Sequence, residues 1–220
     1  MRRDNSALPD AVLATWRHTP RRASSVTILP DGCRDLIVLG RPGERPRWFV
    51  SPLMDGVQHG ACRPGEVWLG FRFRPGIVLQ ESDLVSAMGE IDAEDSSRTC
   101  ERIDELVRVD PRVEEALACL AACESVASAA RACGMSERNL ERLVVQRTGR
   151  RPIWWKQLAR IRRAARVVGT ELPLADVALE SGYADQGHMT RTFRRWFGVT
   201  PSQLRRDAAL LALTGEAGFA

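Results

Sequence analysis

Two stretches in the carboxyl-terminal half carry side chains whose types and spacing suit contact with nucleic acid bases. The more basic one is GYADQGHMTRTFRRWFG, from Gly182 to Gly198, in which arginine, histidine and glutamine side chains accompany an apolar stripe. An arginine can bridge O6 and N7 of guanine, and a glutamine can pair with adenine. A solvated helix face can carry the same charges, so the surrounding elements must decide between the two interpretations.

Basic charge is concentrated in this half of the chain. The 220 residues have a net charge of +4, but the segment 124–207 holds sixteen Arg or Lys against eight Asp or Glu, and the remainder sixteen against twenty. Lys156 is the sole lysine. The positive charge is therefore almost all guanidinium, which binds phosphate or guanine through paired hydrogen bonds.

The basic stretch is the second copy of an internal repeat. VASAARACGMSERNLERLVVQRTGRRP and LADVALESGYADQGHMTRTFRRWFGVTP share alanine and glycine positions 48 residues apart before the central turn, and arginine, glycine and proline positions 49 residues apart after it. One residue inserted in the second turn explains the change in spacing. Two copies of one supersecondary unit are therefore expected.

Each copy is expected to contain a helix, a turn and a second helix. Gly134 or Gly182 lies at the turn, where glycine can adopt a positive φ. Ser136 or Asp185 can then cap the second helix. Between the copies, Pro152 begins a helix in which Trp154, Leu158, Ile161, Ala165 and Val168 are expected to share one face. The pattern predicts two helix-turn-helix units, each placing its second helix in a major groove, joined by a helix of about 24 Å.

On these motifs, the region 126–206 resembles the DNA-binding domain of AraC-type (AraC/XylS) transcription regulators. GYADQGHMTRTFRRWFGVTPSQLR is similar to the most specific signature of that family, and ARACGMSERNLERL fits its first unit, although Val144 stands where phenylalanine is frequent. The resemblance implies a sequence-specific bacterial regulator of transcription. It places the DNA-binding domain at 124–220, with units at about 126–148 and 173–198 and a linker helix at 152–168.

Candidate DNA contacts are the side chains opposite the apolar stripes. Those expected to contact bases, at the positions that the resemblance also implies, are Arg138, Glu141, Arg142, Gln186, Gly187, His188 and Arg191. Those expected to contact the phosphate backbone are Arg150, Arg151, Arg194, Arg195, Arg205 and Arg206. Solvated helix faces are the alternative, and the repetition of the pattern favours DNA.

The amino-terminal region, 1–90, is expected to be rich in β-strands. Proline- and glycine-containing turns separate short apolar runs, and in EVWLGFRFR the apolar residues alternate with Trp68, Arg72 and Arg74. ILPDGCRDLIVL and GFRFRPG resemble a poorly characterised, cupin-like sensor domain that precedes AraC-type DNA-binding domains. The expected fold class is thus α+β, with a small β-rich, cupin-like barrel, a helical linker at 91–123 and an all-α domain.

A ligand or signal at the amino-terminal region is expected to modulate DNA binding. Trp68, Arg72 and Arg74 could line a pocket for an anionic or planar ligand, and Cys33 and Cys62 could sense thiol chemistry. The alternatives are a strand face that is exposed or packed on helices, and buried structural cysteines.

Other function classes are less compatible with the sequence. His18 and His59 are the only histidines of the amino-terminal region and form no HxH pair, so we expect no metal, no cofactor and no enzyme. A metal-dependent cupin-like enzyme fused to a DNA-binding domain and a non-specific architectural DNA-binding protein are the alternatives.

Localisation and partners follow from the same features. No apolar run reaches the ~20 residues of a membrane span, and no signal-peptide pattern is present, so a cytoplasmic protein without membrane contact is expected. Double-stranded DNA is the expected partner. RNA polymerase, a small-molecule effector, and a monomeric or homodimeric state stay open.

Overall fold

The amino-terminal part is built from two antiparallel sheets. The computed structural model describes residues 8–220, so the start of the expected region 1–90 lies outside the described residues. The strands are β1 (Val12–His18), β2 (Ser24–Ile28), β3 (Asp35–Gly40), β4 (Arg47–Val50), β5 (Gln58–Cys62) and β6 (Val67–Phe73). One sheet has the order β1-β6-β3-β4, and β2 pairs with β5 in the other.

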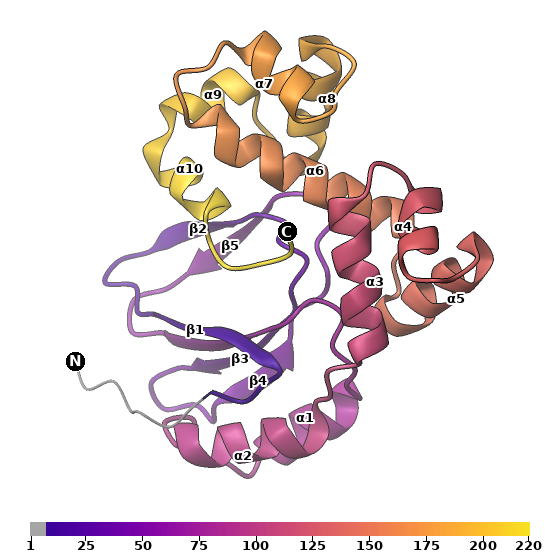
Figure 1. Ribbon diagram of the computed structural model, residues 1–220. Helices are drawn as coiled ribbons and strands as arrows, with labels where there is room; N and C mark the ends of the chain where they lie inside the picture. Colours follow the sequence, from indigo (N-terminus) through magenta and orange to yellow (C-terminus); the bar gives the residue numbers. More distant parts are fainter. Residues whose placement is uncertain (1–7) are drawn as a thin grey trace.

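Beyond β6 the described chain is helical. The helices are α1 (Glu81–Met88), α2 (Ser96–Leu106), α3 (Pro111–Ala122), α4 (Val126–Ala132), α5 (Glu137–Thr148), α6 (Pro152–Val168), α7 (Leu174–Glu180), α8 (Gln186–Phe197), α9 (Pro201–Arg206) and α10 (Ala208–Thr214). Figure 1 shows the strands followed by this helical part, which confirms the expected α+β class. Among the described residues, no helix is long and apolar enough to cross a membrane.

Strand β6 lies in the middle of the larger sheet and separates two environments. Its alternating apolar residues include Phe71 and Phe73, which join a core with α1 and α2 beneath the sheet (Figure 1). Trp68 and Arg72 alternate with them and face the opposite side, toward the smaller sheet. Gly70 is required between them, because a Cβ there would lie 2.0 Å from the indole of Trp16.

The segment expected to be a helical linker, 91–123, contributes residues to two different hydrophobic cores. Ile103 of α2 packs in the core beneath the larger sheet. Val113, Leu117 and Leu120 of α3 instead pack in the core that contains α4 to α10. The change from one core to the other falls just before Pro111, where Asp110 accepts a hydrogen bond from the backbone of Arg112 and caps α3.

Helix α6 is the axis of the carboxyl-terminal core. It spans Pro152–Val168, and Leu158, Ile161, Ala165 and Val168 are buried as the sequence predicts. Trp154, on the same face, is half-buried against this core, whereas its neighbour Trp155 is fully buried. Trp154 turns toward the amino-terminal part, where its indole nitrogen donates to Asp55 over 2.7 Å. Helices on several sides of α6 explain why its buried surface is wider than one stripe.

Candidate nucleic-acid interface

The repeated units have the caps and turns that their sequences predict. Ser136 accepts a hydrogen bond from the backbone of Asn139 at the start of α5, and Asp185 does the same for His188 at the start of α8. Gly134 and Gly182 have φ values of 64° and 74° in the two turns. Two helix-turn-helix units, α4–α5 and α7–α8, are therefore formed on either side of α6.

In both units the second helix buries its apolar stripe and exposes the residues expected to contact bases. Leu140 and Val144 of α5 are fully buried, as are Met189 and Phe193 of α8. The exposed set is Arg138, Arg142, Gln186, Gly187 and Arg191, and Glu141 and His188 are half-buried. His188 packs edge-on against Tyr183, with ring centroids 5.3 Å apart.

The arginines of these exposed faces have no ion-pair partner within the described chain. They are Arg138, Arg142, Arg191, Arg194 and Arg195. Gly187 lies beside Arg191: a Cβ at that glycine would be in ordinary contact, at 3.5 Å, with a guanidinium nitrogen of Arg191 and closer, at 3.1 Å, to the Asp185 carboxylate. Exposed, basic side chains without ion-pair partners in the protein are suited to contact base edges and phosphates in a nucleic acid groove.

Other predicted phosphate contacts are occupied by groups of the protein itself. Arg151 pairs with Glu141 over 2.8 Å, so two predicted DNA contacts bind each other. Arg205 donates to the carbonyl oxygens of Val168 and Leu172 over 2.8 and 2.6 Å. Arg206 donates to the carbonyl oxygen of Ser202 in its own helix. Arg150 pairs with Asp55.

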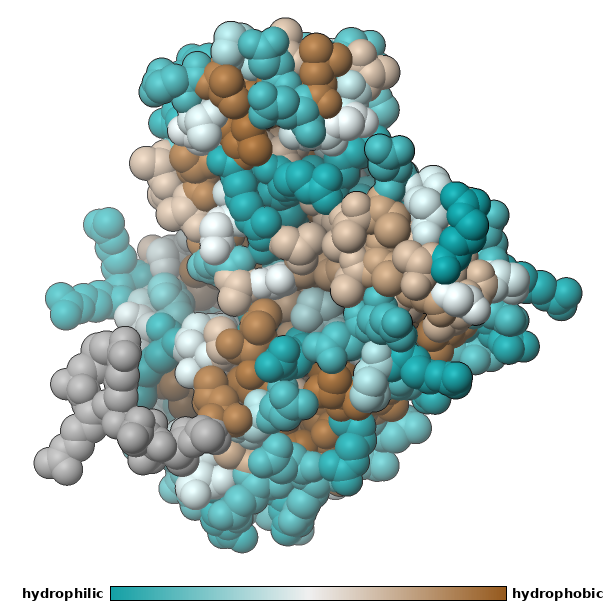
Figure 2. All heavy atoms as spheres, in the orientation of Figure 1, coloured by the Kyte–Doolittle hydropathy of each residue, from teal (hydrophilic) through white to brown (hydrophobic). Residues whose placement is uncertain are grey.

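Part of the basic charge holds helices together. On the face drawn in Figure 2, hydrophilic residues form a band where α6 crosses the molecule. Lys156 and Arg163 of α6 donate to backbone carbonyls at the end of α3, including Ala121 at 2.8 Å from Arg163. Arg160 donates to the carbonyl of Gly182. Cations are stabilising at helix carboxyl ends, so these residues contribute to packing.

Residues 129–207 match the protein family described as a helix-turn-helix domain. These residues form an AraC-type helix-turn-helix domain. The chain is 32% identical over 115 residues to the transcriptional activator NphR of Rhodococcus sp. The matched region covers 52% of this chain and 33% of the relative. The chain thus spans about a third of that relative's length.

Solved structures show further similarities to the AraC-type domain. The carboxyl-terminal domain of AraT, a response regulator from Geobacillus stearothermophilus, is 28% identical over 45% of this chain and 87% of its own, with a TM-score of 0.41. An AraC-type transcriptional regulator from Chromobacterium violaceum is 27% identical over 49% and 96%, with a TM-score of 0.42. ToxT from Vibrio cholerae O395 is 10% identical over 92% and 97%, with a TM-score of 0.47.

A loop of the amino-terminal part contacts both units of the AraC-type domain. In the β4–β5 loop, Asp55 pairs with Arg150 over 2.9 Å, and the carbonyl of Leu53 accepts from the same guanidinium over 2.8 Å. The backbone nitrogen of Val57 donates to the carbonyl of Trp196, at the end of α8, over 2.9 Å. Sequence reasoning missed this loop, because no local pattern reveals a contact between such distant segments.

A cavity of about 680 Å³ lies between the two sheets and reaches the last residues of the AraC-type half. Trp68, Arg72, Cys33 and Cys62, proposed from the sequence as sensor residues, line it. Arg74 does not. Its guanidinium instead pairs with Asp10 and Glu114. Arg74 thus packs outside the cavity, as the alternative of a strand face packed on other elements describes.

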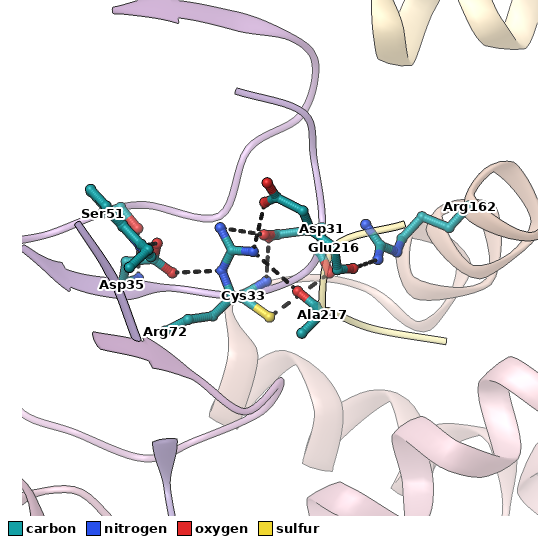
Figure 3. Close-up of polar contacts among 9 residues, drawn as sticks. Asp31, Cys33, Asp35, Ser51, Arg72, Arg162, Glu216 and Ala217 are labelled. Carbon is teal, nitrogen blue, oxygen red and sulfur yellow. Dashed lines mark hydrogen bonds and ion pairs between the residues drawn. The ribbon is translucent and has the colours of Figure 1, made fainter. Parts of the chain in front are cut away.

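Arg72 is the centre of the polar end of the cavity (Figure 3). Its guanidinium contacts the carboxylates of Asp31, Asp35 and Glu216 at 3.4, 3.3 and 3.2 Å. Burial lowers the pKa of Arg72, but the charges of Asp35 and Asp31 outweigh burial and give a net rise in that pKa. Arg72 is therefore a fully cationic group whose charge is already balanced by the protein.

The two cysteines of the cavity are buried thiols. Burial raises the pKa of Cys33 far above its usual value, and the Asp31 carboxylate adds to the rise. Burial also raises the pKa of the Cys62 thiol. Because the thiolate is the reactive form, these positions are poorly suited to thiol sensing. Among residues 8–220, no three or more His, Cys, Asp or Glu side chains are arranged so that they could hold a metal ion.

Proposed function

We propose that the protein is a sequence-specific regulator of transcription that binds duplex DNA through α5 and α8. The observation that carries this proposal is the pair of exposed basic faces, held by one core around α6. Arg138, Arg142, Gln186 and Arg191 have the chemistry to read base edges, while Arg194 and Arg195 can bind phosphates. One chain presents two reading helices, so a single protomer can cover a two-turn site.

The test is a mobility-shift titration against DNA from upstream of the chain's own gene, with unrelated duplex as competitor. Arg142→Ala and Arg191→Ala should each weaken binding to the preferred site by about 1 to 3 kcal/mol and relax base preference at one position. Arg98→Ala is the matched control, because Arg98 is an exposed arginine on α2, away from both units. If both variants bind and discriminate like Arg98→Ala, the assignment of α5 and α8 is wrong.

We also propose that the cavity between the sheets is the input of this regulator. It is large enough for a small-molecule ligand, since such pockets commonly measure ~300 to 1,000 Å³. The same cavity has in its wall Leu213 of α10 and Glu216, which follows that helix. A ligand in the cavity would thus contact both halves of the chain.

A further inference from the structure

We propose that the cavity between the sheets binds a small aromatic or aliphatic molecule that ends in a cationic group, such as a protonated amine. The proposal rests on the proposed function for its effect on DNA, but the binding itself can be tested without DNA.

The greater part of the wall is apolar. Trp16, Phe49 and Trp68 line the cavity together with aliphatic side chains such as Ile37 and Met54. Trp16 is held in place, because its indole nitrogen donates to Asp35 over 2.7 Å and its ring lies over Gly70. Such walls bind an apolar body by burial, and aromatic faces also attract a cation.

The guanidinium of Arg72 is already occupied by the protein. Its Nε contacts Asp35, its Nη1 contacts the Glu216 carboxylate and the Ala217 carbonyl, and its Nη2 contacts Asp31. An anionic ligand would have to displace carboxylates that are held beside Arg72 by the fold. Of the anionic or planar ligand expected from Trp68, Arg72 and Arg74, the occupied guanidinium therefore favours the planar kind over the anionic.

Asp31 is the carboxylate with capacity to spare. Its Oδ1 accepts a hydrogen bond from the backbone of Cys33 over 2.8 Å. Its Oδ2 makes no hydrogen bond within the described chain and has only the 3.4 Å ion-pair contact with Arg72. Burial raises the pKa of Asp31 more than Arg72 lowers it, so the negative charge is incompletely compensated. A ligand cation beside Oδ2 would supply the missing compensation.

The neighbouring cation Arg162 forms no ion pair with Asp31, and its charge makes the last of the contributions that lower the pKa of that carboxyl. It lies on α6 and donates to the backbone carbonyl of Glu216 over 2.8 Å (Figure 3), leaving the carboxylate of Glu216 to Arg72. The polar end thus gathers three carboxylates, from Asp31, Asp35 and Glu216, around one guanidinium in direct contact with them.

Asp31 also holds the segment that links the cavity to α6. Its backbone carbonyl accepts from the nitrogen of Phe219 over 2.7 Å. The ring of Phe219 packs edge-on against Trp155 of α6, with centroids 4.9 Å apart. A cation at Asp31 competes with Arg72, whose partners besides Asp31 and Asp35 are Glu216 and Ala217. Binding is thereby transmitted through residues 216–219 to the helix that joins the two DNA-binding units.

The test uses the full chain and three probes of matched shape: phenylbutylamine, phenylbutanol and phenylbutyrate. Binding at neutral pH is followed by tryptophan fluorescence, because Trp16 and Trp68 line the cavity, and by calorimetry. We expect the amine to bind about tenfold more tightly than the alcohol, and the carboxylate most weakly. No saturable binding of the amine, or equal binding of all three probes, overturns the proposal.

Two variants locate the charge recognition. Asp31→Asn should lower the affinity for the amine about tenfold and leave that for the alcohol unchanged. Glu216→Gln should also lower the affinity for the amine. Because Glu216 is half-exposed, this variant does not depend on correct folding around Asp31. Asp104→Asn is the control, because Asp104 is exposed on α2. Unchanged amine affinity in both cavity variants overturns the proposal.

A mobility-shift arm separates this proposal from the DNA-binding function. The amine should change the DNA affinity of the unmodified chain and have no effect on that of Asp31→Asn. If the amine binds as expected but leaves DNA affinity unchanged, transmission through residues 216–219 is wrong. Failure of the DNA-binding function would instead appear as an absence of preferred-site binding without any probe.

Discussion

The arginines of the carboxyl-terminal half fall into two groups that composition alone cannot separate. Arg142 and Arg191 lie opposite buried stripes and have no internal ion-pair partner, as the repeat predicts. The sequence predicts phosphate contacts for Arg151 and Arg205, but in the structure these two bind groups of the protein. Periodicity reveals which face of a helix a side chain occupies. It does not reveal a partner on another element, and this limits the prediction of phosphate contacts.

Gly32 tests how tightly the carboxyl-terminal segment is packed. It has a φ of 78°, and a Cβ there would lie 2.7 Å from Phe219 and 2.9 Å from Leu158. Gly43 has a similar φ of 77° but nothing within 4 Å. Gly43→Ala should therefore lower the free energy of unfolding by about 1 to 2 kcal/mol, the cost of the left-handed conformation alone.

Gly32→Ala should cost the same conformational term and, in addition, about 1 to 3 kcal/mol for forcing Phe219 and its neighbours apart. Urea unfolding of both variants measures the difference. Equal losses of stability would mean that the segment near Phe219 is not packed against this turn in solution.

At the scale of elements, local signals sufficed for the helices and strands but not for the contacts between them. The caps at Ser136 and Asp185 and the glycines that end α5 and α8 follow from turn chemistry within a few residues. The β4–β5 loop carries no such signal, although it bonds to Arg150 and Trp196. Contacts of this kind depend on tertiary packing, so only the structure reveals them.

The β4–β5 loop predicts a competition between Asp55 and DNA for Arg150. Asp55→Asn removes the carboxylate that pairs with the Arg150 guanidinium at 2.9 Å. Released from this pair, Arg150 can bind a phosphate, so the affinity for DNA should rise. The slope of log affinity against log salt should steepen by about 0.9, the value for one more phosphate contact.

Glu44→Gln is the matched control for Asp55→Asn. Glu44 is an exposed carboxylate of the amino-terminal part, paired with Arg41 over 3.5 Å, so the two substitutions change the net charge equally. Fluorescence anisotropy at several salt concentrations compares them. A salt slope that steepens equally in both variants would assign the effect to overall charge and not to the release of Arg150.

At the scale of the whole molecule, a single core makes the two DNA-binding units one body. Buried residues of α5, α6 and α8, among them Val144, Trp155 and Phe193, belong to the same cluster. The sequence predicts both units and the helix between them. The amino-terminal part adds contacts to this body: Asp55 accepts a hydrogen bond from Trp154, and the carbonyl of Asp31 accepts one from the backbone nitrogen of Phe219. Both units are therefore also connected to the cavity.

This rigidity predicts that the spacing of the two half-sites in DNA is fixed. Helix α6 has 17 residues and packs on both units, so the reading helices cannot separate or rotate independently. Half-sites are expected about 10 base pairs apart, on one side of the duplex. Inserting five base pairs between them turns the second half-site to the opposite side, and binding should fall to that of a single half-site.

This prediction is measured by anisotropy titrations on the preferred site and on variants of that site with inserted base pairs. Ten inserted base pairs return the second half-site to the same side of the duplex but move it a full turn of about 34 Å farther away. One rigid body cannot span the added distance, so this variant should also bind like a single half-site. The same insertion outside both half-sites should leave binding unchanged. Full affinity with ten inserted base pairs would show that the two units move apart, and that the common core around α6 does not hold them on DNA.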